Sequence, residues 1–357
     1  MILTIIGNRP QLIKAAMVSK AFAANGIAEQ LLYTYQHYDV NLFEKNCEEL
    51  GLQFTNHKLV NKQPQSLHDY IYNIEVQVNE SALADKKIKA VLVYGDTNST
   101  VAGTLFAKKH HLKLIHVEAG ERSYNNTMPE EHNRIATDYA ADLLLCVNAK
   151  SKQNVANKIY QSKKLIVGDI MLDALLHFKN YDTAITVHKK VAALVNAKQP
   201  YIYFTLHRHA NTTEVSNVNS ILKMLGQLPY TVVWPMHPRL HSVKTKLSIP
   251  NNIIVTLPIA YIENIKIVTA AIAVITDSGG LQKEAYWLQK QCITLRADTE
   301  WTETLHHNWN TLYTGNNAKD IISILHKKIN LTTWNIKQFG NAKAAYNITK
   351  AVKAYIQ

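Results

Sequence analysis

The stretch IAVITDSGGLQKEA, residues 272–285, joins an apolar run to a turn of small residues and a helix-forming segment. The run at residues 272–276 has the length and composition of a strand that is buried on both faces. The small residues that follow allow a tight turn into a helix. A strand, a tight turn and a helix in this order are typical of the repeating unit of a parallel sheet.

The same alternation runs through nearly the whole chain. Continuous apolar strands joined by helices predict parallel sheets with both faces covered. In the first half, strands are expected at residues 2–6, 30–35, 91–94, 112–117, 143–147 and 165–167. In the second half, they are expected at residues 201–206, 231–235, 253–257, 272–276 and 292–295.

The length of 357 residues and the 47% content of hydrophobic residues favour two domains. Residues 168–200 contain no obvious strand, so the border should fall there. We expect two Rossmann-like domains, at residues 1–170 and 171–340, and a C-terminal helix at 341–357 that packs back on the first domain. The predicted fold class is α/β, with two parallel sheets facing a cleft, where ligands bind at the carboxyl ends of the strands.

Cysteine usage and hydropathy indicate the cellular location to expect for this chain. Cys47, Cys146 and Cys292 are widely spaced and form no CxxC pair, which predicts reduced thiols, a cytoplasmic location and no zinc site. No apolar run approaches 18 residues, so no membrane span is expected. Residues 1–6 have no basic flank before them and indicate a first strand, not a signal peptide.

The net charge of +12 raises the possibility of a nucleic-acid partner. The lysines are scattered in small groups, however, without the interleaved aromatic residues of a single-strand platform. We therefore expect no nucleic-acid partner, and interpret the basic surface as one that attracts an anionic small substrate. A basic nucleic-acid-binding protein remains the alternative from another class.

The segment GNRPQLIK, residues 7–14, follows the first expected strand directly. Pro10 suits the first turn of a helix, where its missing N–H costs nothing. Arg9 would then stand at a helix N-terminus, which is a natural anion site. Lys14 lies four residues after Pro10 on the same helix. The alternative is an ordinary solvated turn.

The segment DSGGLQKEA, residues 277–285, predicts a diphosphate site. Ser278, Gly279 and Gly280 would let backbone amides reach a phosphate at a helix N-terminus, where the helix dipole favours negative charge. Glu284 could accept hydrogen bonds from ribose hydroxyls. The pattern is not GxGxxG, so no nicotinamide cofactor is implied, and the alternative is a structural Gly-Gly turn.

Three carboxylates are expected at the rim of the first sheet. Asp96 follows the strand at residues 91–94, Glu118 follows the strand at 112–117, and Glu130 begins the helix that carries Arg134. Carboxylates that converge on one rim are suited to moving a proton to and from a sugar carbon. For either Glu130 or Glu131, the alternative is ordinary negative charge at a helix N-terminus.

Basic side chains end two strands of the second half. His207 and Arg208 follow the strand at residues 201–206, and His237 and Arg239 follow the strand at 231–235. Both sets can bind a phosphate through charge-assisted hydrogen bonds. His207 and His209 could instead be metal ligands, but no carboxylate stands at metal-site spacing, so no metal is expected.

Taken in order, these segments resemble the non-hydrolysing UDP-N-acetylglucosamine 2-epimerases from about residue 2 to 315. The resemblance lies in GNRPQLIK at 7–14, VLVYGDTNST at 91–100, IHVEAG at 115–120, MPEEHNR at 128–134 and DSGGLQKEA at 277–285. It implies a GT-B architecture, a homodimer, and UDP bound without metal or NAD. It also implies elimination of UDP to a 2-acetamidoglucal and re-addition of UDP.

Residue roles also follow from this resemblance. It assigns UDP binding to Arg9, Ser278, Gly279 and Glu284. Contacts to the reacting sugar or its diphosphate fall to Lys14, Asp96, Glu118, Glu130, Arg134 and His207.

The expected reaction converts UDP-GlcNAc to UDP-ManNAc, for surface polysaccharide precursors. The segment Thr299-Glu300-Trp301 resembles a subgroup that acts on UDP-diacetamido-uronic acids or UDP-N-acetyl-6-deoxyhexoses. A hydrolysing 2-epimerase or a GT-B glycosyltransferase is a further alternative.

The chemistry of the reaction agrees with these residue types. No carbonyl group next to C2 makes its proton acidic. Cleavage of the C1–O bond should therefore precede loss of this proton and create oxocarbenium character at C1. Arg9 and His207 would stabilise the leaving diphosphate. A carboxylate would stabilise the cation or take the proton, and two carboxylates could serve opposite faces of the sugar. The sequence leaves open which carboxylate has which role.

Overall fold

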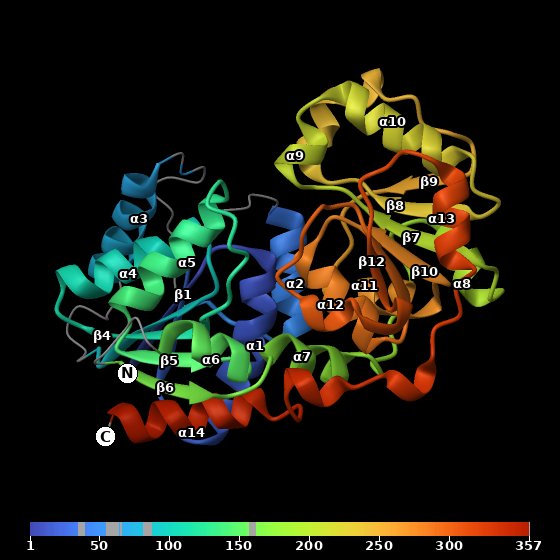
Figure 1. Cartoon of the computed structure of the whole chain (residues 1–357). Helices are drawn as coiled ribbons and strands as arrows, with labels where there is room; N and C mark the ends of the chain where they lie inside the picture. The colour runs from blue at the N-terminus through green and yellow to red at the C-terminus, as the bar shows by residue number, and fades with distance from the viewer. Residues whose placement is uncertain (35–39, 55–63, 65, 81–87, 157–161, 357) are drawn as a thin grey trace. The chain divides into compact units, whose positions relative to one another are not determined.

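A computed structural model describes residues 1–34, 40–54, 64, 66–80, 88–156 and 162–356. The chain forms two compact units, one made of residues 1–176 and 336–357 and the other of residues 177–335 (Figure 1). The division into domains at residues 170 and 340 and the cleft between the two sheets stay predictions.

The first unit is built on a six-stranded sheet in the order β2-β1-β3-β4-β5-β6. All neighbouring strands are parallel, and Ile2 in β1 pairs with Glu29 in β2 and with Ala90 in β3. β1 lies next to the edge strand β2, and β3 to β6 follow in order on its other side, as in a doubly wound sheet. The strands are β1 (Ile2–Ile6), β2 (Glu29–Tyr33), β3 (Ala90–Tyr94), β4 (Lys113–Ala119), β5 (Leu143–Cys146) and β6 (Lys163–Ile166).

Helices cover this sheet and bury its apolar side chains. Val91 and Val93 of β3 are fully buried in a core that also contains Phe106. A methyl group on Gly103 would lie 2.8 Å from Val93 Cγ1, so one helix packs very closely on the strand. The helices are α1 (Arg9–Ala24), α2 (Val40–Leu50), α3 (Leu67–Glu80), α4 (Asn98–Lys109), α5 (Pro129–Ala140), α6 (Ala149–Ala156), α7 (Ile170–Phe178) and α14 (Ala344–Ile356).

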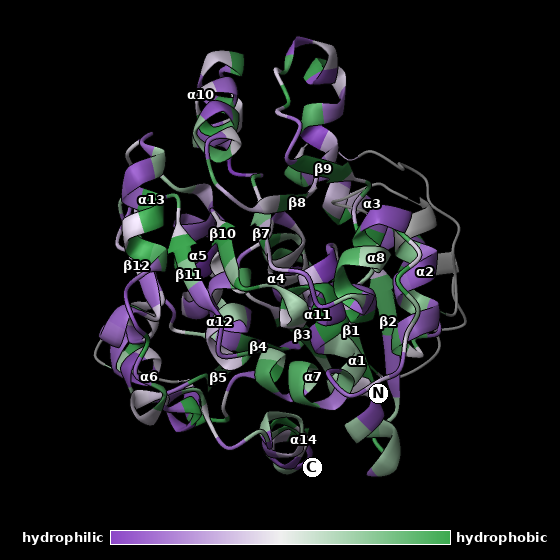
Figure 2. Ribbon diagram, turned by 90° about the vertical axis from the view of Figure 1, so that its right-hand side faces the viewer, coloured by the Kyte–Doolittle hydropathy of each residue, from purple (hydrophilic) through white to green (hydrophobic). Residues whose placement is uncertain are grey.

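The second unit repeats the plan with a parallel sheet in the order β12-β11-β10-β7-β8-β9. Its strands are β7 (Tyr201–Thr205), β8 (Thr231–Pro235), β9 (Ile253–Thr256), β10 (Ala273–Thr276), β11 (Gln291–Thr294) and β12 (Asn310–Leu312). The longer helices around it are α8 (Lys189–Asn196), α10 (Val215–Gly226), α11 (Tyr261–Ala270), α12 (Gly279–Trp287) and α13 (Ala318–Leu325). Figure 2 shows β10 and β11 in hydrophobic colours, whereas α13 carries both colours because one of its sides faces water.

The parallel sheets and eleven of the strands agree with the sequence prediction, apart from a few terminal residues. The strand β12 was not predicted, because Asn310–Leu312 is short and lacks an apolar run. The expected end of the fourth strand at residue 117 is wrong, since β4 continues to Ala119. Tyr35, the last residue of the second expected strand, lies outside the described residues.

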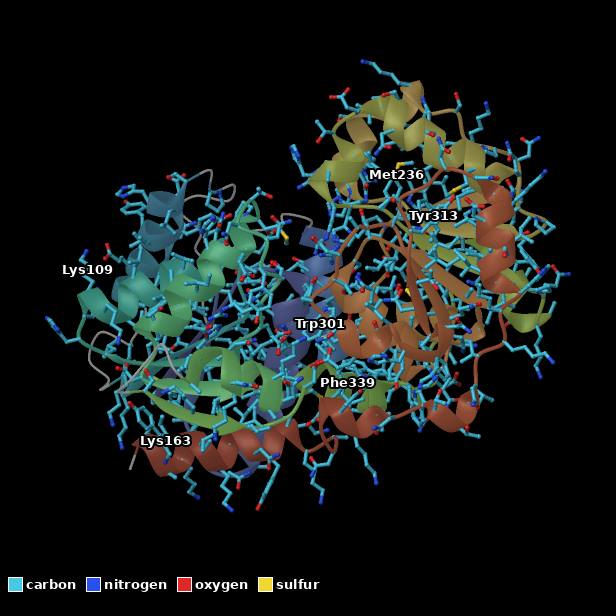
Figure 3. The ribbon with its side chains drawn as sticks, in the orientation of Figure 1. Lys109, Lys163, Met236, Trp301, Tyr313 and Phe339 are labelled. Carbon is cyan, nitrogen blue, oxygen red and sulfur yellow. The ribbon has the colours of Figure 1, made fainter. Side chains whose placement is uncertain are left out.

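The last segment of the chain returns to the first unit. Asp169 N donates to Phe339 O at 2.8 Å, Ala345 N to Asp173 Oδ2 at 2.8 Å, and Asn347 Nδ2 to Val167 O at 3.0 Å. The ring of Phe339 is fully buried beside this junction (Figure 3). Beyond it, α14 lies along α1.

Among the residues that the structure describes, no helix is both long enough and apolar enough to cross a membrane.

Two side chains on α14 provide a test of its packing. Ile348 is fully buried, whereas Tyr346 is 59% exposed on the same helix. We expect Ile348→Ala to lower the free energy of unfolding by about 2–5 kcal/mol, because it leaves a cavity. Tyr346→Ala should change it by less than about 0.5 kcal/mol. Urea unfolding followed by circular dichroism measures both, and equal losses would contradict the described packing of α14.

Candidate functional site

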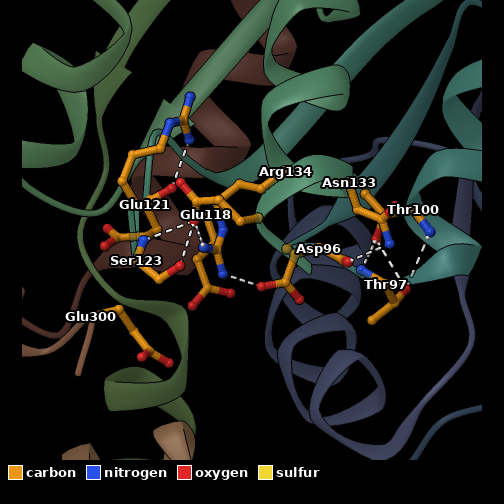
Figure 4. Close-up of polar contacts among 12 residues, drawn as sticks. Asp96, Thr97, Thr100, Glu118, Glu121, Ser123, Asn133, Arg134 and Glu300 are labelled. Carbon is orange, nitrogen blue, oxygen red and sulfur yellow. Dashed lines mark hydrogen bonds and ion pairs between the residues drawn. The ribbon is translucent and has the colours of Figure 1, made fainter. Parts of the chain in front are cut away.

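The turn after β3 carries Asp96. Gly95 has a φ of +62°, and Thr97 caps α4 by accepting a hydrogen bond from Thr100 N at 3.2 Å. The side chain of Asp96 is 26% exposed and forms an ion pair with Arg134 of α5 (Figure 4). Asn133, the residue before Arg134, donates from Nδ2 to Asp96 O at 3.0 Å. Helix α5 therefore fixes both the backbone and the carboxylate of Asp96.

The surroundings of Asp96 shift the pKa of its carboxyl group. Burial raises the pKa of its carboxyl, the Arg134 guanidinium lowers it, and the negative charge of Glu118 raises it again; Lys14 lowers it and Glu130 raises it to lesser extents. The net effect is a raised pKa. A carboxyl group that can hold a proton nearer to neutral pH is suited to general acid–base chemistry.

Glu118 lies in a strained part of β4. Its φ is +69°, and the pairing of β4 with β5 shifts register between Val117 and Ala119, which marks a β-bulge. We expected Glu118 to follow the strand, but it lies within it, and the bulge turns its side chain out of the regular alternation. A non-glycine residue held at positive φ costs free energy and often marks a functional site.

The carboxylate of Glu118 forms an ion pair with Lys14 Nζ, which comes from α1. Both side chains are largely buried, with exposures of 13% for Glu118 and 9% for Lys14. A Cβ atom on Gly95 would lie 3.5 Å from Glu118 Oε2 and 3.8 Å from Lys14 Nζ. The turn that carries Asp96 therefore passes directly beside this ion pair, and a glycine suits both the φ and the close approach.

The two glutamates at the start of α5 have different surroundings. Glu130 is exposed in the first turn, and its charge is one of the groups that raise the pKa of Asp96. Glu131 is buried and accepts hydrogen bonds from Ser123 N at 2.8 Å, Ser123 Oγ at 2.9 Å and Arg134 Nη1 at 3.2 Å. Sequence reasoning did not single out Glu131, although its three-residue spacing to Arg134 is a signal for such a pair.

Arg9 is the first residue of α1 and is half-buried. Asn8 caps the helix, accepting from Gln11 N at 3.1 Å, and Pro10 lies in the first turn as the sequence predicts. In the first unit, the structure thus brings Lys14, Asp96, Glu118 and Arg134 together, and it places Arg9 at a helix start.

In the second unit, α12 begins directly after β10. Ser278 caps this helix, with Oγ accepting from Leu281 N at 3.3 Å, and Ser278 N donates to Thr276 Oγ1 at 2.9 Å. Gly280 has open space where a side chain would stand. Glu284 lies on the same helix and is largely buried. This arrangement is the strand, turn and helix start that the sequence predicts for binding an anion.

A buried aspartate organises the neighbouring turn. Asp277 accepts from His207 N at 3.1 Å and Arg208 N at 2.9 Å, from Asn211 Nδ2 at 3.1 Å, and lies 2.9 Å from His207 Nδ1. Burial alone would raise the pKa of Asp277, but the hydrogen bond and charge of His207, with the other donors, outweigh it and lower this pKa. The ionised carboxylate therefore orients the imidazole of His207, which is 37% exposed.

The basic residues of the second unit form one group around His207. Arg239 Nη1 donates to His207 O at 2.9 Å, and His237 Nδ1 accepts from Arg239 N at 3.2 Å. The imidazole rings of His207 and His237 have centroids 5.8 Å apart. The imidazoles of His207 and His237 and the side chain of Arg239, which were expected to contact a phosphate, therefore lie close together.

Arg296 and Glu300 were not assigned to the site from sequence, whereas Arg208 was expected beside a phosphate. A side chain on Gly279 would overlap Glu300 Oε1, so this carboxylate lies against the first turn of α12. Arg296 Nη1 is 2.9 Å from Glu300 Oε2, and Arg208 Nη2 is 3.7 Å from Glu300 Oε1. Residues 296–300 follow β11, so their position after a strand could have identified them as candidate site residues.

Comparison with known proteins identifies the family to which this chain is similar. The family model for UDP-N-acetylglucosamine 2-epimerase matches residues 20–353. A UDP-2,3-diacetamido-2,3-dideoxy-D-glucuronate 2-epimerase of Pseudomonas aeruginosa is 38% identical over 328 residues, covering 90% of each chain. A UDP-N-acetylglucosamine 2-epimerase of Methanococcus maripaludis is 32% identical over 365 residues, covering 98% of this chain and 97% of the other.

The fold matches a solved structure as well. The crystal structure of the Methanocaldococcus jannaschii UDP-GlcNAc 2-epimerase in complex with UDP-GlcNAc and UDP has a TM-score of 0.83 at 30% identity. The match covers 99% of this chain and 100% of that one. The two-domain α/β fold of GT-B type that the sequence predicts is thereby confirmed. The chain belongs to the UDP-N-acetylglucosamine 2-epimerase family and is an isomerase of that type.

Proposed function

We propose that this protein inverts C2 of a UDP-linked 2-acetamido sugar, with UDP-GlcNAc and UDP-ManNAc as the first pair to test. The observation that carries this proposal is the pair of carboxylates on neighbouring strand ends, each beside its own cation. Asp96 pairs with Arg134 and Glu118 with Lys14. Such a pair can exchange a proton with a carbon atom from two directions, which an inversion at that carbon requires.

The reaction proceeds by elimination and addition. The C1–O bond breaks and UDP leaves with the electron pair, while the proton on C2 passes to a carboxylate and a C1=C2 double bond forms. In the second half, a proton is delivered to the opposite face of C2 and UDP adds again at C1. The net change is a rearrangement without oxidation, so the scheme needs no hydride carrier.

The surroundings of the two carboxylates suggest how the steps are divided. The raised pKa of Asp96 favours the protonated form, so Asp96 is suited to deliver a proton. The ammonium group of Lys14 favours the ionised form of Glu118, which is the form that can accept a proton. Glu130, exposed at the start of α5, is the third carboxylate in this scheme.

The second unit supplies the groups that hold UDP in this proposal. Backbone amides of Gly279 and Gly280 and the hydroxyl of Ser278 bind the diphosphate at the start of α12, and Glu284 accepts from the ribose hydroxyls. In this scheme, His207, His237, Arg239 and Arg9 neutralise the departing UDP. Asp277 holds the imidazole of His207 in position, with Oδ1 2.9 Å from Nδ1.

A UDP-2,3-diacetamido-uronic acid is the second candidate substrate. The observation that favours it is the 38% identity to the Pseudomonas aeruginosa enzyme, compared with 32% to the Methanococcus maripaludis enzyme.

A homodimer and a cytoplasmic location complete the proposal. The location rests on Cys47, Cys146 and Cys292, all of which are free thiols.

Turnover of a substrate panel in deuterated water tests the proposal directly. UDP-GlcNAc, UDP-N-acetyl-6-deoxyhexoses and the UDP-diacetamido-uronic acid are incubated separately and followed by NMR. We expect a C2 epimer that carries solvent deuterium at C2. Release of free sugar with accumulating UDP would identify a hydrolase instead, and absence of turnover across the panel would refute the proposed activity.

Replacing one carboxylate separates catalysis from binding. We expect Glu118→Gln to lower kcat by at least about 100-fold, because an amide cannot take the proton. The dissociation constant of UDP, measured by calorimetry, should change less than about twofold, because UDP is assigned to other residues. Glu75→Gln, on the exposed Lys109 pair, serves as the control. Equal losses of kcat and of UDP affinity in Glu118→Gln would disprove its catalytic role.

The role of Ser278 can be tested against a matched helix cap. Ser278 and Asn317 both cap helices of the second unit, α12 and α13. Replacing either by Ala should lower the free energy of unfolding by about 1 kcal/mol. Only Ser278→Ala should also weaken UDP binding, by roughly tenfold, through loss of a hydrogen bond to a charged group. If both variants bind UDP as the parent does, Ser278 has no part in the diphosphate site.

A further inference from the structure

A fully buried ion pair connects the two turns that carry Asp96 and Glu118. His116 of β4 and Asp138 of α5 are both inaccessible to solvent, and His116 Nδ1 lies 2.8 Å from Asp138 Oδ1. The other ring nitrogen, His116 Nε2, lies 2.8 Å from the carbonyl oxygen of Gly95. One imidazole therefore links α5 to the backbone immediately before Asp96.

The carboxylate of Asp138 reaches the second turn. It accepts from Gly120 N, at 3.1 Å from Oδ2, and lies 2.6 Å from Arg122 Nη2. Burial acts to raise the pKa of Asp138, but His116 and Arg122 outweigh it, so the pKa is lowered and the group is ionised. Gly120 directly follows the bulge that contains Glu118, so Asp138 fixes the backbone on that side.

The hydrogen-bond partners determine how many protons the imidazole carries. The carbonyl oxygen of Gly95 can only accept, so His116 Nε2 must carry a hydrogen. The ionised Asp138 also only accepts, so Nδ1 must carry one as well. His116 is therefore an imidazolium ion in this arrangement, held between a carbonyl dipole and a carboxylate. A charge-assisted hydrogen bond of this kind is stronger than a neutral one.

We infer that His116 and Asp138 are positioning residues for epimerisation, which together fix the backbone of the Asp96 turn and of the Glu118 bulge. This inference rests on the proposed function. It adds two groups that touch no substrate but set the relative placement of the two carboxylates. Arg122 completes the cluster, as it pairs with Asp138 from the segment after Gly120.

Both turns need such a restraint. Glu118 has a φ of +69°, and a strained conformation of this kind persists only when its surroundings hold it. Gly95 has a φ of +62°, which glycine adopts without strain but does not prefer strongly, so hydrogen bonds must fix its turn. The backbone of Gly95 makes hydrogen bonds from both sides, since its N–H donates to Val117 O at 3.0 Å. Without the imidazolium, the carbonyl of Gly95 loses its donor, and the Asp96 turn can shift away from the bulge.

Two near-isosteric variants separate the two hydrogen bonds of the ring. A glutamine amide reaches the place of His116 Nε2, so His116→Gln keeps a donor to Gly95 O and loses the link to Asp138. An asparagine amide reaches the place of Nδ1, so His116→Asn keeps the link to Asp138 and loses the one to Gly95. Both variants remove the same charge and leave a polar side chain at the same buried position.

We expect His116→Asn to lower kcat by about 100-fold, since displacing a catalytic group by about 1 Å can cost that much. His116→Gln should keep kcat within about tenfold of the parent, as the conservative rescue. KM and the dissociation constant of UDP should change far less than kcat in both variants. Thr104→Val serves as a stability control, because it removes a buried hydroxyl that bonds within α4 and to α5. This control should lower the melting temperature without changing kcat.

A purely structural role for His116 would make the Asn and Gln variants equal in kcat, or would reduce kcat and UDP affinity in parallel, and either result overturns the inference. The ¹⁵N NMR spectrum of the parent supplies a readout apart from activity. Two protonated ring nitrogens on His116 are expected, and a single protonated nitrogen would also overturn it. Absence of turnover by the parent on every UDP sugar would instead count against the proposed function, leaving the NMR result to decide the protonation of His116.

Discussion

The parallel pairing of β3 with β4 is the constraint on which the placement of Asp96 and Glu118 depends. Tyr94 pairs with Val117 at the carboxyl end of both strands, so the residues that follow must emerge side by side. Asp96 reaches the edge through a tight turn and Glu118 through a bulge, and a cation from a neighbouring helix meets each of them. The sheet therefore sets the separation of the carboxylates, and the helices supply the opposite charges.

The two units fix the turns at their candidate sites in the same way. Each buries an ionised aspartate that accepts hydrogen bonds from backbone N–H groups and from an imidazole. Asp138 does so for the turns of the first sheet, and Asp277 does so for the turn that carries His207. A buried carboxylate is costly unless several donors satisfy it, so each cluster has one favourable arrangement and holds its turn in place. The difference lies in the imidazole, which is fully buried in the first unit and partly exposed in the second.

Much of this architecture could be predicted from local sequence patterns. Apolar runs of three to six residues, in alternation with helix-forming segments, identified every described strand except β12. Position after a strand was enough to single out Asp96, His207 and Ser278, because parallel strands present their carboxyl ends at one edge. Pattern alone could not distinguish Glu130 from Glu131, because adjacent residues at a helix start share charge and composition and differ only in tertiary burial.

The bulge at Glu118 and the cluster around His116 could not be predicted from local patterns either, because both depend on contacts between distant parts of the chain. A bulge depends on pairing with another strand, and His116 and Asp138 are 22 residues apart in sequence. A histidine within an apolar strand is usually interpreted as a core residue, and its two partners become visible only when the turn and α5 are placed around it. The resemblance to a known family identified the segment IHVEAG without indicating what its histidine contacts.

The path of the chain has a consequence for how the protein is made. The first unit consists of residues 1–176 together with 336–357, so the whole of the second unit is inserted into it. During synthesis, α1 has no α14 to cover it until the last segment has left the ribosome. The second unit, continuous from 177 to 335, can complete its own sheet earlier. The half that carries the carboxylates is thus begun before the second unit and completed after it, and the side of α1 that contacts α14 stays uncovered in the interval.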